Sequence, residues 1–275
     1  MNLALDSIGL IAGSRTLPLD FARLARAAGV KRIVAVAAEG ETDPALAGLV
    51  DEIVWLNVGQ IGKMISAFAS RGIKYCVMAG QLAPKNLFDL RPDLRAMGVL
   101  LRLKEKNAHT LFGAVAEELK KDGVELLDAT PWLAPLMPQT GFALGPKLSA
   151  AQQDDVALGH RIAKEVSRLE IGQLVVVKDG AVLAVEAFEG TDKCLTRGGE
   201  LAGKNGGAVA VKVAKPDHDM RFDIPCIGPK TFETCAAAKI AVLALESGKS
   251  LLLERERCEE LARQNKISVT TVTVN

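Results

Sequence analysis

The chain is poor in aromatic residues, carries almost no net charge and contains no long hydrophobic run. Of its 275 residues, 4% are Phe, Trp or Tyr, and the formal net charge is +1. Few aromatic side chains leave few platforms for stacking nucleic-acid bases, and a near-neutral chain offers no broad basic surface to a phosphate backbone. No apolar stretch approaches the roughly 18 residues that a membrane-spanning helix needs. We therefore expect no nucleic-acid partner and no spanning helix.

Cysteine motifs are missing as well. The five cysteines are scattered without a CxxC pair, at positions 76, 194, 226, 235 and 258. Cys76, Cys235 and Cys258 fall on apolar positions of expected strands or helices, which is typical of buried free thiols. Free thiols suit a reducing compartment, and the first residues lack the pattern of a secretory signal. We therefore expect a cytoplasmic protein.

The length suggests about two domains, each large enough to bury a core. Residues 1–130 alternate strand and helix patterns, and the short connections predict a Rossmann-like parallel sheet covered on both faces. The expected strands are residues 8–12, 33–37, 53–58, 75–79 and 124–127, and the expected helices are residues 17–28, 61–68 and 110–121.

The pattern lapses over residues 131–149, which contain several prolines and glycines and read as an interdomain linker. Residues 150–275 then predict a mixed α+β domain. Asp179 and Gly180 supply the tight turn of a hairpin between two Val-rich runs. Further strands are expected at residues 209–213 and 267–274, and helices at residues 152–169, 231–246 and 254–264.

Two loops of the N-terminal half end expected strands at the same edge of the sheet. Residues 9–18 place glycines between a strand and a helix, where backbone N–H groups bind phosphate or ribose. The stretch does not match GxGxxG, so a generic ligand loop is favoured over NAD binding. Gly80 and Gln81 close the 75–79 strand, so the two loops are candidates for one pocket. Two tight βα turns explain the glycines almost as well.

Two polar clusters interrupt apolar sequence in the C-terminal half. The first is residues 189–192 and the second is residues 215–225. Carboxylates there can hold a divalent metal ion through oxygen, and lysines can neutralise phosphate charge. Asp219 and Asp223 lie close to Pro225, which favours a bent loop over a helix. Solvated turns are the competing interpretation of each cluster, but two such clusters favour an active site.

These clusters carry a resemblance to a known family. The sequence resembles the metal-dependent UDP-2,3-diacylglucosamine pyrophosphatases of lipid A biosynthesis, the type unrelated to the calcineurin-like phosphoesterases. The matching stretches run in order through most of the chain, at residues 9–13, 17–18, 169–173, 184–192, 211–212, 215–216 and 219–228.

The resemblance implies hydrolysis of UDP-2,3-diacylglucosamine to UMP and 2,3-diacylglucosamine 1-phosphate, with Asp223 as the essential residue. It agrees with a hypothesis in which Mg²⁺, or Mn²⁺ in its place, is held by Asp223, Asp219 and Asp192. Lys212 and Lys215 complete the candidate catalytic set as phosphate-neutralising groups. The candidate substrate-binding residues are Ala12, Gly13, Gly80, Gln81, Gln173, Glu189, Gly190 and Thr191.

A lipid-linked UDP-sugar substrate would bring the protein to the inner membrane surface and requires an apolar groove. Residues 97–101 and 132–137 are candidates for its lining, although internal packing is the favoured explanation of both. Strand-rich C-terminal edges suggest a homodimer. Two other functions remain open: a Rossmann-type oxidoreductase or sugar-nucleotide enzyme, which predicts nicotinamide binding, and a carrier that binds UDP-sugars or lipid without turnover.

Overall fold

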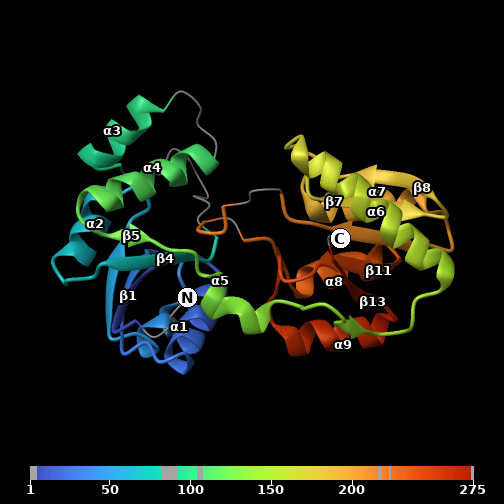
Figure 1. Ribbon diagram of the computed structural model, residues 1–275, viewed down its shortest axis with the longest axis horizontal. Coiled ribbons are helices and arrows are strands. Elements are labelled where there is room, and N and C mark those ends of the chain that lie inside the picture. Colours follow the sequence, from blue (N-terminus) through green and yellow to red (C-terminus); the bar gives the residue numbers. More distant parts are fainter. Residues whose placement is uncertain (1–4, 82–91, 104–107, 216–218, 223, 274–275) are drawn as a thin grey trace. The chain divides into compact units, whose positions relative to one another are not determined.

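The computed structural model describes residues 5–81, 92–103, 108–215, 219–222 and 224–273. Its contacts divide the chain into two units. The N-terminal unit comprises Met1–Leu133 with Met220–Phe222, and the C-terminal unit comprises Ala134–Asp219 with Asp223–Asn275. Figure 1 shows the elements of each unit.

A five-stranded parallel sheet forms the centre of the N-terminal unit, with the strand order β3-β2-β1-β4-β5. Its strands are β1 (Ser7–Ala12), β2 (Arg32–Ala38), β3 (Glu52–Leu56), β4 (Tyr75–Ala79) and β5 (Glu125–Leu126). The apolar runs of β1, β2 and β4 are buried, as parallel strands covered on both faces require. The predicted Rossmann-like sheet is confirmed.

Helices α1 (Leu17–Ala27), α2 (Ile61–Ala69), α4 (Ala108–Lys121) and α5 (Thr130–Leu133) accompany this sheet. Apolar side chains of α2 and α4 pack with β1, β2 and β4 in one core cluster. On α1, the Phe21 ring meets Trp132 of α5 edge-on, with ring centroids 5.9 Å apart. Trp132 and Leu133 are buried, so these two members of the 132–137 segment are packing residues.

The short helix α3 (Leu94–Arg102) was not expected from the sequence. Asp93 caps it by accepting the Ala96 N–H at 2.9 Å, and it also accepts the Gly62 N–H of α2 at 2.7 Å. Two arginines of α3 reach Glu118 of α4. Polar links therefore hold α3 to both of these helices.

The C-terminal unit contains a six-stranded mixed sheet, β6-β13-β11-β9-β7-β8. Its strands are β6 (Ala143–Leu144), β7 (Leu174–Lys178), β8 (Ala181–Val185), β9 (Ala208–Lys212), β11 (Ile240–Glu246) and β13 (Ser268–Val272). Strands β9, β11 and β13 are parallel, whereas β7 joins β9 and β8 in antiparallel pairs. A separate parallel pair joins β10 (Cys226–Ile227) to β12 (Leu251–Leu252). The mixed α+β prediction is confirmed.

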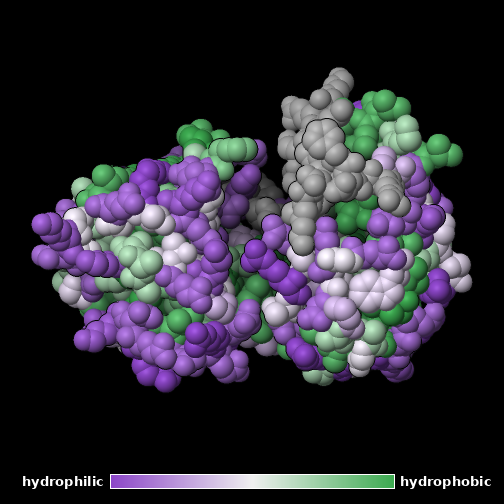
Figure 2. Space-filling view, turned by 180° about the vertical axis from the view of Figure 1, so that it is seen from behind, coloured by the Kyte–Doolittle hydropathy of each residue, from purple (hydrophilic) through white to green (hydrophobic). Residues whose placement is uncertain are grey.

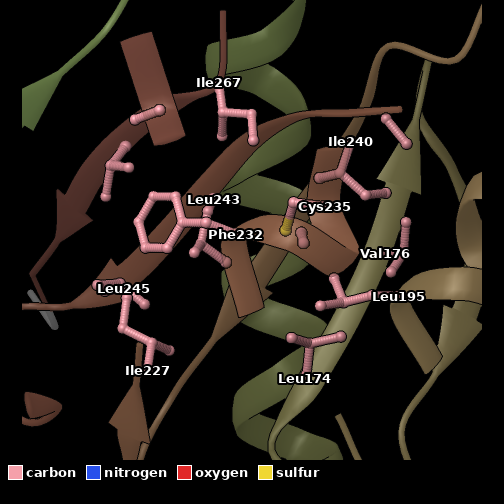
Figure 3. Close-up of a cluster of buried hydrophobic side chains, with 14 of the residues drawn as sticks. Leu174, Val176, Leu195, Ile227, Phe232, Cys235, Ile240, Leu243, Leu245 and Ile267 are labelled. Carbon is pink, nitrogen blue, oxygen red and sulfur yellow. The ribbon is translucent and has the colours of Figure 1, made fainter. Parts of the chain in front are cut away.

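Alternation along the strands sends side chains to two apolar layers. Val175 and Val177 pack in the cluster that contains residues of α6 (Ala150–Arg168). Leu174 and Val176 join the opposite cluster, which Figure 3 shows. Helices α7 (Thr191–Leu201), α8 (Pro229–Ala237) and α9 (Arg255–Asn265) contribute residues to this second layer.

Of two local predictions for this unit, the structure confirms the hairpin and contradicts one helix. The hairpin is confirmed, because β7 and β8 flank Asp179 and Gly180, whose φ values are 49° and 78°. The single helix expected over residues 231–246 is wrong, because α8 ends at Ala237 and β11 begins at Ile240. A fully buried parallel strand is apolar on both faces, so periodicity alone does not distinguish it from a buried helix.

Candidate active site

A cavity of about 340 Å³ opens in the C-terminal unit where several strands end. It brings together three of the expected site residues, Gln173, Lys212 and Lys215. Its lining is completed by Glu170, Ile171, Gly172, Glu186, Ala187, Ile224, Pro225 and Cys226. Segments far apart in the sequence therefore meet at one site.

Lys212 is the last residue of β9 and is 9% exposed. Its Nζ donates to the Thr191 hydroxyl at 3.1 Å and to the Cys226 carbonyl at 3.4 Å. A buried ammonium needs such partners because it has lost its water shell. The contact links Thr191 of the first polar cluster to the end of the strand that leads into the second.

Glu186 orients the Thr191 hydroxyl. Thr191 Oγ1 donates to Glu186 Oε1 at 2.8 Å, and the backbone N–H of Gln173 donates to Oε2 at 3.2 Å. The hydroxyl thus accepts from Lys212 and donates to a carboxylate. Glu186 was missed at the sequence level because it continues the apolar run of β8. An acidic residue directly after an apolar strand-like run was the available signal.

The N-terminus of α7 lies at the same site. Gly190 caps the helix with φ 83° and no side-chain hydrogen bond, and Thr191 and Asp192 form the first turn. The first N–H groups of a helix point outward and carry partial positive charge, which favours a bound anion. The Lys212 ammonium beside Thr191 makes the start of α7 a cationic pole beside the cavity, with the Glu186 carboxylate as its counter-charge.

Glu189 is engaged with a different partner. Arg197 donates to its carboxylate at 2.6 Å, and the Ala187 N–H donates at 3.1 Å. The hydrogen bond from Arg197 is the main cause that holds the pKa of Glu189 below its usual range. Arg197 therefore neutralises the Glu189 carboxylate, which adds little negative charge near the start of α7.

The N-terminal unit places Gly13 and Gly80 against each other at the carboxyl edge of the parallel sheet. A Cβ on Gly13 would lie 2.6 Å from the Gln81 carbonyl oxygen, and one on Gly80 would lie 2.6 Å from that of Ser14. Ser14 and Gln81 form an isolated bridge. The two loops therefore lie together, and the ligand pocket expected between them stays a prediction. The close backbone packing leaves no room for a side chain at either glycine. The Ala12 carbonyl accepts a hydrogen bond from the Thr42 hydroxyl at 2.8 Å.

The expected metal-binding acids are only partly described. Asp192 lies in the first turn of α7, and Asp219 precedes the tripeptide 220–222, whose Phe222 ring contacts Phe112 with centroids 5.7 Å apart. Asp223 lies outside the described residues. In the part of the chain that the structure describes, no three His, Cys, Asp or Glu side chains cluster as metal ligands.

The fold and site define a two-unit α/β protein with a polar cavity in its C-terminal unit, whose lining includes two lysines and two glutamates. Two family models match in sequence order, the LpxI N-terminal domain over residues 7–136 and the LpxI C-terminal domain over residues 139–270. The chain is 33% identical over 260 residues to the UDP-2,3-diacylglucosamine pyrophosphatase LpxI of Caulobacter vibrioides, covering 90% of this chain and 91% of that protein. The chain therefore belongs to the LpxI family.

Similarity to solved structures is distant. The biotin carboxylase domain of a thermophilic 2-oxoglutarate carboxylase shares 14% identity with a TM-score of 0.26, covering 62% of this chain and 34% of that one. N5-carboxyaminoimidazole synthetase from Staphylococcus aureus shares 14% identity with a TM-score of 0.25, covering 76% and 47%. These values are too low to inform the function.

Proposed function

We propose that this chain hydrolyses the pyrophosphate bond of UDP-2,3-diacylglucosamine, releasing UMP and 2,3-diacylglucosamine 1-phosphate. Membership of the LpxI family and the name of the Caulobacter relative support this substrate. The structural observation that carries the proposal is the 3.1 Å contact between Lys212 Nζ and Thr191 Oγ1 at the start of α7, beside the cavity. This arrangement is suited to a pyrophosphate.

The described residues provide charge neutralisation and orientation. A water oxygen forms a bond to one phosphorus as the bridging P–O bond breaks, and negative charge collects on the departing phosphate. Lys212, Lys215 and the N–H groups of α7 stabilise this charge because their positions are fixed before the reaction. Thr191 donates to Glu186 and accepts from Lys212, so its hydroxyl is oriented at the phosphate end of the cavity.

A divalent metal completes the proposed site. We assign Mg²⁺ or Mn²⁺ to Asp223, Asp219 and Asp192, since carboxylate oxygens are the ligands that both ions accept. Held by these carboxylates, the ion would supply further charge neutralisation and polarise a water molecule. The remaining chemistry is provided by the cationic pole described above.

Binding of the uridine and sugar is assigned to two sets of residues. In the C-terminal unit these are Gln173, Glu189 and Gly190. In the N-terminal unit they are the strand-end residues Ala12, Gly13, Gly80 and Gln81. In support, Gln173 lines the cavity, and the N-terminal set lies at the carboxyl edge of a parallel sheet, where ligands of open α/β sheets bind.

We also propose contact with the inner membrane surface through α3. Its apolar residues Leu94, Met97 and Leu101 are 88%, 48% and 84% exposed, and their spacing places them on one helical face. Figure 2 shows hydrophobic residues in green on the surface of the N-terminal unit. Such a face suits a protein whose substrate carries acyl chains. No helix in the described ranges is long and apolar enough to cross a membrane.

Cytoplasmic location and a homodimer belong to the same proposal. The five cysteines are free thiols, and burial raises the pKa of Cys194 and of Cys235 to about 12, which suppresses their reactivity. The edge strand β8 exposes Val182 at 42% and is a candidate for pairing between copies. Light scattering of the purified chain tests the dimer, and a monomer mass at micromolar concentration contradicts it.

The decisive experiment measures UMP release from UDP-2,3-diacylglucosamine with Mg²⁺ or with EDTA. The variants are Asp223→Ala and the matched control Asp154→Ala, which removes an exposed carboxylate of α6. We expect hydrolysis to require metal and to fall at least about 100-fold in Asp223→Ala, but not in the control. A folded native chain that binds the substrate without turnover would instead be a carrier. Unchanged hydrolysis in Asp223→Ala would overturn the assigned role of that residue.

A further inference from the structure

A partly buried ion pair holds Ala214, which lies just before the 215–224 segment. Glu246 is the last residue of β11 and is 4% exposed, and Lys164 Nζ of α6 lies 3.1 Å from both of its carboxylate oxygens. The Ala214 N–H donates to Glu246 Oε2 at 2.9 Å, and Lys164 Nζ donates to the Ala214 carbonyl at 3.0 Å. One ion pair therefore binds both backbone polar groups of Ala214.

The residues that follow the 215–224 segment are held by backbone hydrogen bonds from residues 251–253, shortly after Glu246. The Leu251 N–H donates to the Pro225 carbonyl at 2.8 Å, and the Leu253 N–H donates to the Ile227 carbonyl at 2.9 Å. These bonds extend the β10–β12 pair. Glu246 lies a short turn before β12. Residues 246–253 therefore contact the chain on both sides of the 215–224 segment, at Ala214 and at Pro225.

Stability alone is a poor explanation for this ion pair. Taking two charges out of water costs several kcal/mol, and apolar replacements of similar volume are often as stable. A paired carboxylate and ammonium do, however, fix a backbone group in direction as well as in distance. The sheet hydrogen bonds of β9 end at Lys212. The ion pair restrains the backbone beyond that point, at Ala214.

We infer that Lys164 and Glu246 are positioning residues that fix Ala214 and, through it, the neighbouring Lys215. Lys215 follows Ala214 directly and lines the cavity, so a shift of Ala214 displaces its ammonium from the phosphate. Asp219 lies further along the 215–224 segment. The inference rests on the proposed function for its catalytic consequence, but the restraint on Ala214 is independent of any substrate.

The test compares Glu246→Ala and Lys164→Met with the matched control Asp155→Ala. Asp155 lies on the same helix as Lys164 and is also 4% exposed. Its carboxylate accepts the N–H groups of Asp179 and Gly180 at 2.9 and 2.8 Å, in the β7–β8 turn. The control therefore removes an equally buried carboxylate that holds a different turn of the same unit.

Two readouts are measured on the full-length chain, namely hydrogen exchange of the amides in 213–222 and steady-state hydrolysis. We expect exchange there to accelerate at least about tenfold in both variants and to remain unchanged in Asp155→Ala. We expect kcat to fall about tenfold or more with KM changing less than about threefold, because Lys212 and Thr191 keep their contact. Unchanged exchange in 213–222, or the same acceleration in the control, overturns the inference.

A double variant, Lys164→Met with Glu246→Gln, covers the case in which a single variant fails to fold. It removes both charges and leaves an amide oxygen to accept the Ala214 N–H. We expect intermediate exchange and a partial recovery of kcat, and wild-type values of both overturn the inference. If the native chain fails to hydrolyse the substrate, the proposed function fails while the exchange comparison still decides the inference.

Discussion

Lys212 Nζ lies 3.1 Å from Thr191 Oγ1, so the end of β9 and the start of α7 meet through one hydrogen bond. Thr191 in turn donates to Glu186. A lysine at the end of β9, a hydroxyl at the start of α7 and the carboxylate that follows β8 thus form a short chain beside the cavity. Each member has a separable role, which substitutions distinguish.

Replacing Lys212 with Met removes the ammonium while keeping most of the side-chain volume. We expect kcat/KM to fall about 100-fold or more, because a developing phosphate charge loses a fixed, buried cation. Lys178→Met is the control, since Lys178 ends β7 and donates to the Ala202 carbonyl at 2.8 Å away from the cavity lining. Equal losses in the two variants would indicate a general effect of removing lysine.

Thr191→Val removes the hydroxyl at nearly constant volume. Lys212 then loses an acceptor and Glu186 loses a donor, so we expect kcat to fall about tenfold to 100-fold. Thr191→Ser keeps the hydroxyl and is expected to retain activity within about threefold of the native chain. If Thr191→Ser and Thr191→Val lose the same fraction of kcat, the methyl group of Thr191 contributes more to activity than its hydrogen bonds do.

Gly172→Ala tests the close approach of the α6–β7 loop to the end of β8. A Cβ at Gly172 would lie 2.0 Å from the Glu186 carbonyl oxygen, so the two segments must move apart. We expect a loss of about 1–3 kcal/mol in unfolding free energy together with reduced activity, since Glu186 shifts. Gly113→Ala is the control, because no atom lies within 4 Å of its added Cβ. Urea unfolding of both variants measures the difference.

Glu118 makes the N-terminal unit sensitive to acid. Hydrogen bonds from Lys121 and Arg95 are the main causes that lower its pKa to about 2 from 4.5. A lowered carboxyl pKa stabilises the fold above the unfolded value, so this contribution is lost as the pH falls from about 4.5 toward 2. Arg102 and Lys121 are 61% and 54% exposed, so solvent screening limits the effect to about 1–2 kcal/mol.

Fluorescence can measure this effect in the N-terminal unit, since Trp55 and Trp132 both lie there. We expect Glu118→Gln to unfold more readily than the native chain at pH 7 and to lose this difference near pH 2. Glu117→Gln, at an exposed neighbouring position, should match the native chain. A Glu118→Gln variant with the native pH dependence would contradict the assigned role of this carboxylate.

Local patterns in the sequence were sufficient for much of the fold. The apolar runs of β1, β2 and β4 and the turn at Asp179 predicted a parallel sheet and a hairpin because their signals come from neighbouring residues. The stretch 240–246 could not be assigned correctly, because burial on both faces removes the alternation that identifies a strand. Helix α3 was missed since it is short and bounded by a proline-containing segment.

The sequence by itself determined which residue types were available: lysines and acids next to strand ends, and a Gly-Thr pair suited to an anion. Only the tertiary structure decided which of them meet. Lys212 contacts Thr191, Glu186 joins them, and Glu189 turns to Arg197. These contacts join residues that are far apart in the sequence, so they depend on strand order and register. Strand order and register arise in turn because the apolar layers on both faces of the sheet are buried. Side-chain chemistry is therefore local information, whereas the assembly of the site is a property of the packed fold.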